Sequence, residues 1–352
     1  MERDFQLHTP NSVNCLNTIR LLAALQVVWG HSTRWLEIPV PNTINQLLLL
    51  LQGVPVFFML SGFLIWYSIG RSYNFKEYIL KRFWRLYPEL WVAVIFELIV
   101  VLFMCDRPIE WGKFILFAIS ECTICVYVPS FLHDYGVGGP NGVLWTMFCM
   151  MKFYLIGFVM YKYMHNKSIS SWFVLLLVLC TIGAISRYVS FVQLRYFNFI
   201  WFQSTAPFLW LFAFGTFLAE FWNRGGGRIV KKIWPIALVV SAVVEFSDFD
   251  IICTIPDYGY GLIRCVSILI YSIGFAYCFP SLNIKKDISY PIYLYHMTIL
   301  NILFILGFRH DYILVVIIML ITSILAFTST IYVGEWSKRK KQTLINQAIN
   351  KK

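Results

Sequence analysis

Long apolar runs separated by short polar segments fill most of this 352-residue chain. We interpret ten of them as membrane-spanning helices, each of which takes about 20 mostly apolar residues. The ten runs are residues 17–36, 44–69, 89–105, 144–163, 172–189, 198–221, 233–247, 260–280, 289–308 and 312–334. An eleventh run, 112–128, is short and contains Glu121, so we interpret it as non-spanning. The pattern predicts an all-α, polytopic transmembrane helix bundle of about ten spans.

Composition supports a membrane protein. Hydrophobic residues make up 59% of the chain and charged residues 13%, whereas a typical soluble domain has about 25% charged residues. The nine cysteines are scattered through apolar segments, and the close pair Cys122 and Cys125 has no histidine or second pair nearby. We therefore expect packed thiols, no metal site, and a multi-pass protein of the cell (inner or plasma) membrane.

The net charge of +11 indicates orientation rather than nucleic-acid binding, because the basic residues lie in short segments between apolar runs. With ten spans, 19 basic residues share the side that holds both termini, and six face the other side. The 19 are Arg71, Lys76, Lys81, Arg82, Arg85, Lys162, Lys167, Arg224, Arg228, Lys231, Lys232, Lys285, Lys286, Lys338, Arg339, Lys340, Lys341, Lys351 and Lys352; the six are Arg34, Arg107, Lys113, Arg187, Arg195 and Arg309. We predict that both termini are cytoplasmic, that residues 1–334 form a single transmembrane domain, and that residues 335–352 form a basic cytoplasmic tail lying on anionic headgroups.

The first run begins with a cation and ends with an imidazole. Arg20 and His31 flank the apolar sequence LLAALQVVWG. Eleven residues make about three helical turns, which places both side chains on nearly the same face, about 16 Å apart along the axis. Ionisable residues within a span suggest a functional site by default. The alternative is that Arg20 snorkels to the membrane edge and His31 is satisfied structurally.

Further motifs follow in order along the chain. They are FFMLSGF at 57–63, RFWRLYP at 82–88, LWT at 144–146 with Phe153-Tyr154, and SYPIYLYH at 289–296. Together with Arg20-x10-His31, these motifs resemble the acyltransferase-3 family of integral-membrane O-acyltransferases. The resemblance extends from about Asn17 to the tenth span and is to the stand-alone type, as in O-antigen and exopolysaccharide O-acetyltransferases.

The resemblance implies that an acyl group, usually acetyl, passes from cytoplasmic acyl-CoA to a hydroxyl of a surface or lipid-linked polysaccharide. His31 matches the family's catalytic histidine, and a neutral imidazole is well suited to remove a hydroxyl proton near pH 7. Arg20, Arg82 and Arg85 would bind acyl-CoA, since guanidinium groups hold phosphates bidentately. Without the resemblance, the usual excess of basic residues on the cytoplasmic side of membrane proteins would explain the positions of Arg82 and Arg85.

Five more residues match family positions and are candidates for lining the active site. They are Ser61, Trp145, Tyr154, Tyr293 and His296. Small residues such as Ser61 and Gly62 also permit close helix packing, and aromatic residues at span ends commonly form the interfacial belt. His296 falls within a span near its predicted cytoplasmic end, which suits donor binding.

One position departs from the family pattern. The glutamate that usually follows the tryptophan by five residues is replaced by Met150, so the acceptor, the rate or the activity itself can differ.

Alternative functions are a non-enzymatic transporter or flippase and an inactive acyltransferase relative, but we find no repeat between halves of the kind that transporters show. We expect acyl-CoA as co-substrate, no permanently bound cofactor, a glycan or lipid-linked saccharide acceptor, contact with membrane lipids, and no nucleic-acid partner.

Overall fold

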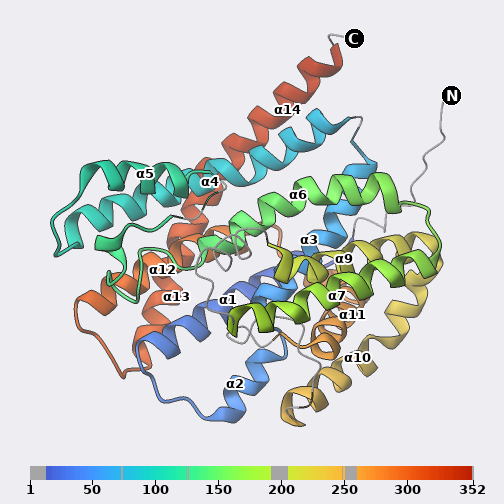
Figure 1. Cartoon of the computed structure of the whole chain (residues 1–352), viewed down its shortest axis with the longest axis horizontal. Coiled ribbons are helices and arrows are strands. Elements are labelled where there is room, and N and C mark those ends of the chain that lie inside the picture. The colour runs from blue at the N-terminus through green and yellow to red at the C-terminus, as the bar shows by residue number, and fades with distance from the viewer. Residues whose placement is uncertain are drawn as a thin grey trace. The chain divides into compact units, whose positions relative to one another are not determined.

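The computed structural model describes residues 13–72, 74–123, 125, 127–191, 205–247, 249 and 260–350, and the regular elements of these residues are helices (Figure 1). This confirms the predicted all-α class. The chain forms two compact units, each built from several segments of the sequence. Unit 1 comprises residues Met1–Ile19, Leu49–Phe75 and Lys152–Ile284, and unit 2 comprises Arg20–Leu48, Lys76–Met151 and Lys285–Lys352.

Unit 1 contains two pairs of helices that lie along one another, α3 with α9 and α10 with α11 (Figure 1). Its elements are α3 (Gly53–Gly70), α7 (Ile169–Phe191), η2 (Ala206–Phe208), α9 (Leu209–Phe221), η3 (Trp222–Gly226), α10 (Gly227–Ser247), α11 (Leu262–Cys278) and η4 (Pro280–Leu282). The backbones of α3 and α9 approach closely, because a Cβ on Gly62 would overlap the carbonyl oxygen of Phe212 and one on Gly215 would overlap that of Met59. Small residues at such crossings are typical of membrane helices, where packing rather than hydrophobicity holds helices together.

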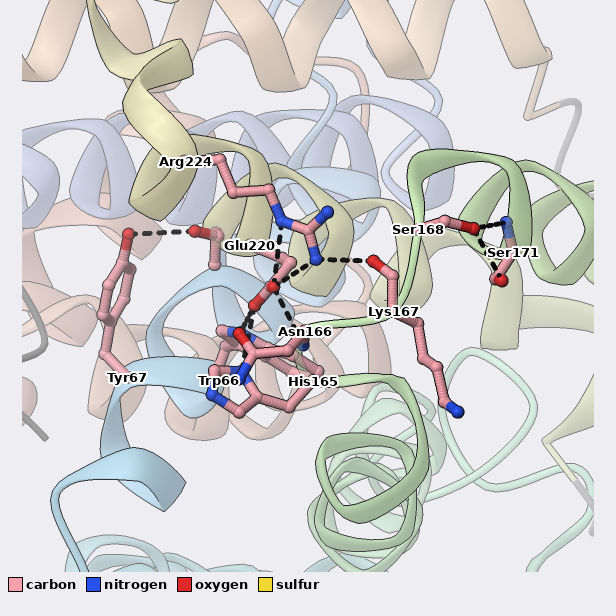
Figure 2. A network of polar contacts seen from close by, with 10 residues as sticks. Trp66, Tyr67, His165, Asn166, Lys167, Ser168, Ser171, Glu220 and Arg224 are labelled. Atoms are coloured by element: carbon pink, nitrogen blue, oxygen red, sulfur yellow. Dashed lines mark hydrogen bonds and ion pairs between the residues drawn. The ribbon is translucent and has the colours of Figure 1, made fainter. Parts of the chain in front are cut away.

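A buried carboxylate joins three segments of unit 1 (Figure 2). Glu220 of α9 is 2% exposed. Its Oε2 accepts a hydrogen bond from the Trp66 indole at 3.0 Å and lies 3.1 Å from Nδ1 of His165. Its Oε1 accepts hydrogen bonds from the backbone of Asn166 at 3.1 Å and from Arg224 at 2.7 Å. The surrounding donors compensate the cost of burying this charge, and they connect α3 and α9 to the turn at 165–167.

Unit 2 contains α12 and α13, which lie along one another, and α13 continues through the π-helical turn η5 into α14 (Figure 1). Its elements are α1 (Leu16–Trp35, from Arg20 on), α2 (Asn42–Leu49), α4 (Phe75–Met104), α5 (Trp111–Glu121), η1 (Ser130–Leu132), the first part of α6 (Leu144–Met164), α12 (Ser289–Ile305), α13 (Ile313–Ser329), η5 (Thr330–Gly334) and α14 (Glu335–Asn350). Asn301 of α12 donates hydrogen bonds to the carbonyl oxygens of Gly139 and Pro140 and accepts one from the backbone of Val137. These bonds hold the loop that leads into α6.

Five helical stretches of the described residues are long and apolar enough to cross a membrane. They are Asn42–Gly70, Phe75–Met104, Leu144–Met164, Ile169–Ser186 and Ile313–Leu344, and two shorter apolar helices are Leu262–Cys278 and Ser289–Ile305. Each of the ten predicted runs overlaps a helix, although residues 198–204 lie outside the described part of the chain. The number of spans and the side of each terminus stay predictions.

The third predicted run differs from the structure in its start. The helix begins at Phe75 rather than near residue 89, and Pro88 lies inside it. A proline removes one backbone hydrogen bond, but here the helix continues through it. Consequently Arg82 and Arg85 lie on the same continuous helix as the apolar residues that follow them.

The Glu220 network generates a stability prediction. Glu220→Gln removes the charge and replaces an acceptor by a donor, so we expect the free energy of unfolding to fall by about 2–4 kcal/mol. Thermal unfolding of the purified protein in detergent measures this as a lower midpoint temperature. The control is Glu110→Gln, which removes an exposed ion pair with Lys113 and should change stability by less than about 1 kcal/mol. Equal stability of the two variants would contradict the prediction.

Candidate functional site

Two histidines contact each other in unit 2. His31 lies near the end of α1, and His296 lies in the middle of α12. Nδ1 of His31 is 2.9 Å from Nε2 of His296, and the two ring planes differ by 8°. His296 is fully buried, whereas His31 is partly exposed. The structure therefore brings together two residues that the sequence separates by 265 positions.

Hydrogen-bond partners assign the protons of this pair. Nδ1 of His296 is 2.9 Å from the carbonyl oxygen of Tyr293, which can only accept, so this nitrogen carries a proton. In a neutral imidazole the other nitrogen then has a lone pair, so Nε2 of His296 accepts a hydrogen bond from Nδ1 of His31. Nε2 of His31 keeps its own lone pair, and no described residue hydrogen bonds to it. The pair thus presents one unprotonated nitrogen on a partly exposed ring, which can act as a base.

A second polar contact joins the N-terminal ends of the same two helices. Asp287, just before α12, forms ion pairs with Arg20 of α1 and, at 3.4 Å, with Arg85 of α4. Burial alone would raise the pKa of Asp287, but the charges of Arg20 and Arg85 hold that pKa below its usual range. Hydrogen bonds from the backbone and hydroxyl of Ser289 act in the same direction. Asp287 is therefore an ionised group that holds two guanidinium groups side by side.

The two contacts require α1 and α12 to run in the same direction. Arg20 precedes His31 by eleven residues, which is about 16 Å of helix, and Asp287 precedes His296 by nine, about 14 Å. The N-terminal members of both pairs contact each other, and so do the C-terminal members. The two helices therefore lie side by side and parallel, with cations at one end and imidazoles at the other.

A cavity of about 120 Å³ adjoins the Asp287 ion pairs. One water molecule needs about 10–15 Å³, so the cavity has room for a considerably larger group. It lies where α4, η5 and α14 meet the segment before α12, and its lining consists of Trp84, Arg85, Pro88, Glu89, Asp287, Tyr290, Thr330, Gly334, Ser337, Lys338 and Lys341.

Of the two predicted aromatic residues of unit 2, Tyr293 and Trp145, Tyr293 lies beside the histidine pair. The ring of Tyr293 is 5.7 Å from that of His296 between centroids. The hydroxyl of Tyr293 is hydrogen bonded to that of Thr146, 2.8 Å away, at the start of α6. Trp145 is the neighbour of Thr146 in the chain and is partly buried. Tyr293 therefore connects the start of α6 to the turn of α12 that carries His296.

Two predicted residues, Ser61 on α3 and Tyr154 on α6, belong to unit 1. Ser61 is partly buried and precedes Gly62, whose contact with α9 supports the close-packing interpretation of that position. Tyr154 is buried, at 6% exposed. Their predicted role in lining an active site stays a prediction.

Sequence reasoning missed Asp287. It is the only acidic residue between Asp257 and Asp311, and it follows two lysines directly before a predicted span. That isolated carboxylate was a usable signal, but its partner Arg20 is 267 positions away. Met150, at the position of the family glutamate, is buried in α6 at 8% exposed.

Comparisons with known proteins confirm the resemblance. A family model, that of the acyltransferase-3 family and described as an acyltransferase domain, matches residues 13–332. Nodulation protein 10 of Rhizobium leguminosarum bv. viciae is 26% identical over 327 residues, which cover 85% of this chain and 86% of that protein. The O-acetyl transferase of Shigella phage Sf6 is 25% identical over 295 residues, covering 80% and 83%. The peptidoglycan O-acetyltransferase OatA of Listeria monocytogenes is 28% identical over 114 residues, covering 30% and 18%. No solved structure matches the chain.

The lowered pKa of Asp287 predicts a pH-dependent contribution to stability. An unfolded aspartate has a pKa of about 3.9, so the ion pairs stabilise the fold above about pH 4 and stop doing so as the pH falls through the lower folded value. At pH 7, Asp287→Asn should lower the free energy of unfolding by about 1–3 kcal/mol. The difference in unfolding temperature between wild type and variant should then narrow below about pH 4. A pH-independent difference, or one no larger than that of the exposed Asp134→Asn, would contradict this.

Proposed function

The chain belongs to the acyltransferase-3 family, and from that premise we propose that it transfers an acyl group, acetyl in particular, from cytoplasmic acyl-CoA to a hydroxyl of a surface or lipid-linked polysaccharide. Membership makes it an acyltransferase, and its apolar helices make it a multi-pass membrane protein. The names of two relatives, an O-acetyl transferase and a peptidoglycan O-acetyltransferase, support oxygen as the acceptor atom and acetyl as the group.

The observation that carries the mechanism is the contact between His31 and His296. Nε2 of His31 removes the proton of the acceptor hydroxyl while the hydroxyl oxygen attacks the thioester carbon of the donor. The carbon–sulfur bond breaks, and the departing thiolate takes the proton from His31, so no net proton is gained or lost. During the transfer His31 is an imidazolium, and its Nδ1–H is stabilised by the lone pair on His296.

The donor would lie along α1, with its phosphates at Arg20, Arg82 and Arg85 and its thioester at His31. The ion pairs of Asp287 support this arrangement, because they hold the guanidinium groups of Arg20 and Arg85 together at one end of the helix. Ser61, Trp145, Tyr154, Tyr293 and His296 would line the path of donor or acceptor. Acyl-CoA is then a co-substrate, and the proposed activity requires no permanently bound cofactor.

The parallel course of α1 and α12 supports the proposed count of ten spans, and the partition of the basic residues supports a cytoplasmic location for both termini. These helices correspond to the first and ninth predicted spans, and two odd-numbered spans must run in the same direction. If α5 also crossed the membrane, α12 would become the tenth span and would have to run antiparallel to α1. We accordingly propose a single transmembrane domain over residues 1–334, a cytoplasmic tail over 335–352, and residence in the cell membrane in contact with its lipids.

Replacement of His31 tests the mechanism. His31→Gln keeps a hydrogen-bonding group without a base, so acyl transfer should fall by about 10²–10⁴-fold while acyl-CoA still binds. His296→Phe removes the acceptor for the His31 Nδ1–H and should reduce kcat about tenfold, whereas His296→Gln, which can accept that bond, should lose less. Transfer of acetyl from radiolabelled acetyl-CoA in membranes is the measurement, with His310→Gln as an exposed control. Near-normal acyl transfer by His31→Gln would contradict the proposed mechanism.

Reporter fusions test the topology. A reporter fused after Asp257 should lie outside the cytoplasm, and one fused after Lys352 should lie inside, because the 19 basic residues of one side and the six of the other are partitioned that way. Fusions to alkaline phosphatase and to green fluorescent protein, made at each position, distinguish the two compartments. If both fusions report the same compartment, the count of spans is wrong.

A further inference from the structure

The C-terminal helix α14 is attached to the helix that carries Arg82 and Arg85. The hydroxyl of Ser337 donates a hydrogen bond to the carbonyl oxygen of Trp84, and the rings of Trp336 and Trp84 pack edge to face with centroids 5.5 Å apart. These contacts fix α14 against α4 at the position just before Arg85. The basic residues of α14 are therefore placed beside α4 by specific contacts.

Two pairs of cations come together at this attachment. Arg82 and Arg85 are three residues apart on α4, and Lys338 and Lys341 are three apart on α14, so each pair shares one helix face. Arg85, Lys338 and Lys341 line the same cavity of about 120 Å³. The ammonium group of Lys341 is repelled by all three of its cationic neighbours in this group and also by Lys81.

The carboxylates nearby form ion pairs with two of the three cations that line the cavity. Asp287 is shared by Arg20 and Arg85, and Lys338 pairs with the exposed Glu335. Glu89 also lines the cavity, where Arg85 and Lys338 attract its carboxylate, and its Oε1 lies beside Gly334. Lys341 forms no ion pair with a described carboxylate. A half-buried ammonium beside other cations is unfavourable unless an anion joins them.

We propose that Lys341 and Lys338 of α14 complete, with Arg85 and Arg82 of α4, a binding site for a phosphate group of the acyl donor. This inference rests on the proposed function and extends it to a helix outside the family motifs. A phosphate presents several acceptor oxygens to cations on both helices, and the cavity is large enough to hold one. The ribose phosphate and the diphosphate of CoA have this chemistry, and so do the headgroups of anionic phospholipids. We assign the site to the donor because the same cavity is lined by Asp287, which is bonded to Arg20 on the helix of His31.

Binding measurements with the full chain in phosphatidylcholine nanodiscs test the assignment. Lys341→Gln should weaken CoA binding about tenfold or more, the expected loss of one charge-assisted bond. Binding of pantetheine, which has no phosphate, should stay unchanged. Lys341→Arg should bind CoA nearly as well as wild type. The matched control is Lys340→Gln, on the same helix but exposed and away from the cavity, and it should leave CoA binding unchanged.

The following results would overturn the assignment. Equal losses for CoA and pantetheine would mean a general distortion, and equal losses in Lys340→Gln and Lys341→Gln would mean diffuse attraction. Unchanged CoA binding in Lys341→Gln, together with lower retention of phosphatidylglycerol in mixed nanodiscs, would assign the site to a lipid headgroup. Failure of the wild type to bind CoA at all would overturn the proposed function as well, whereas normal binding by both wild type and Lys341→Gln would overturn only this inference.

Discussion

The hydrogen bond from His296 to the carbonyl oxygen of Tyr293 is the interaction on which the candidate chemistry depends. A carbonyl oxygen cannot donate, so this contact fixes which nitrogen of the buried ring carries a proton. The remaining lone pair of His296 then determines the tautomer of His31, and the tautomer determines which atom of His31 is a base. A backbone atom of α12 thus controls a reactive atom on α1, through a neutral imidazole in the place that a carboxylate occupies in a catalytic triad.

Because α1 and α12 run parallel, the spacing of residues along the two helices sets the distance between their two contacts. One end of the pair holds the guanidinium of Arg20 and the carboxylate of Asp287, and the other end holds the two imidazoles. About three turns of helix separate the ends, so cations and base cannot approach each other closely. A substrate that reaches both must therefore be extended, with a negatively charged group at the end that meets the cations. Acyl-CoA has this form, so the geometry supports the donor that we propose.

The sequence predicted the helical class and the Arg20–His31 face well, because both depend on local periodicity. It also identified Tyr293 and His296 as candidates, but only through their match to family motifs. It did not predict that His296 contacts His31 or that Asp287 pairs with Arg20, since these contacts span 265 and 267 positions and leave no local pattern. It did not predict that α4 begins at Phe75, because hydropathy marks only the apolar part of that helix and Pro88 lies between this part and the charged residues before it.

The polar atoms of Glu220 differ from those of His31 and Lys341 in how far the chain itself satisfies them. Glu220 is buried in unit 1, and each of its oxygens has at least two donors, so its charge is fully used in holding three segments together. In unit 2, Nε2 of His31 and the ammonium of Lys341 have no hydrogen-bonding partner among the described residues, although both residues are half-buried. Neither atom is sealed from solvent, so each can bond water in the free protein and exchange that water for a group of a substrate. In the proposed complex the base would meet an acceptor hydroxyl and the ammonium would meet a phosphate.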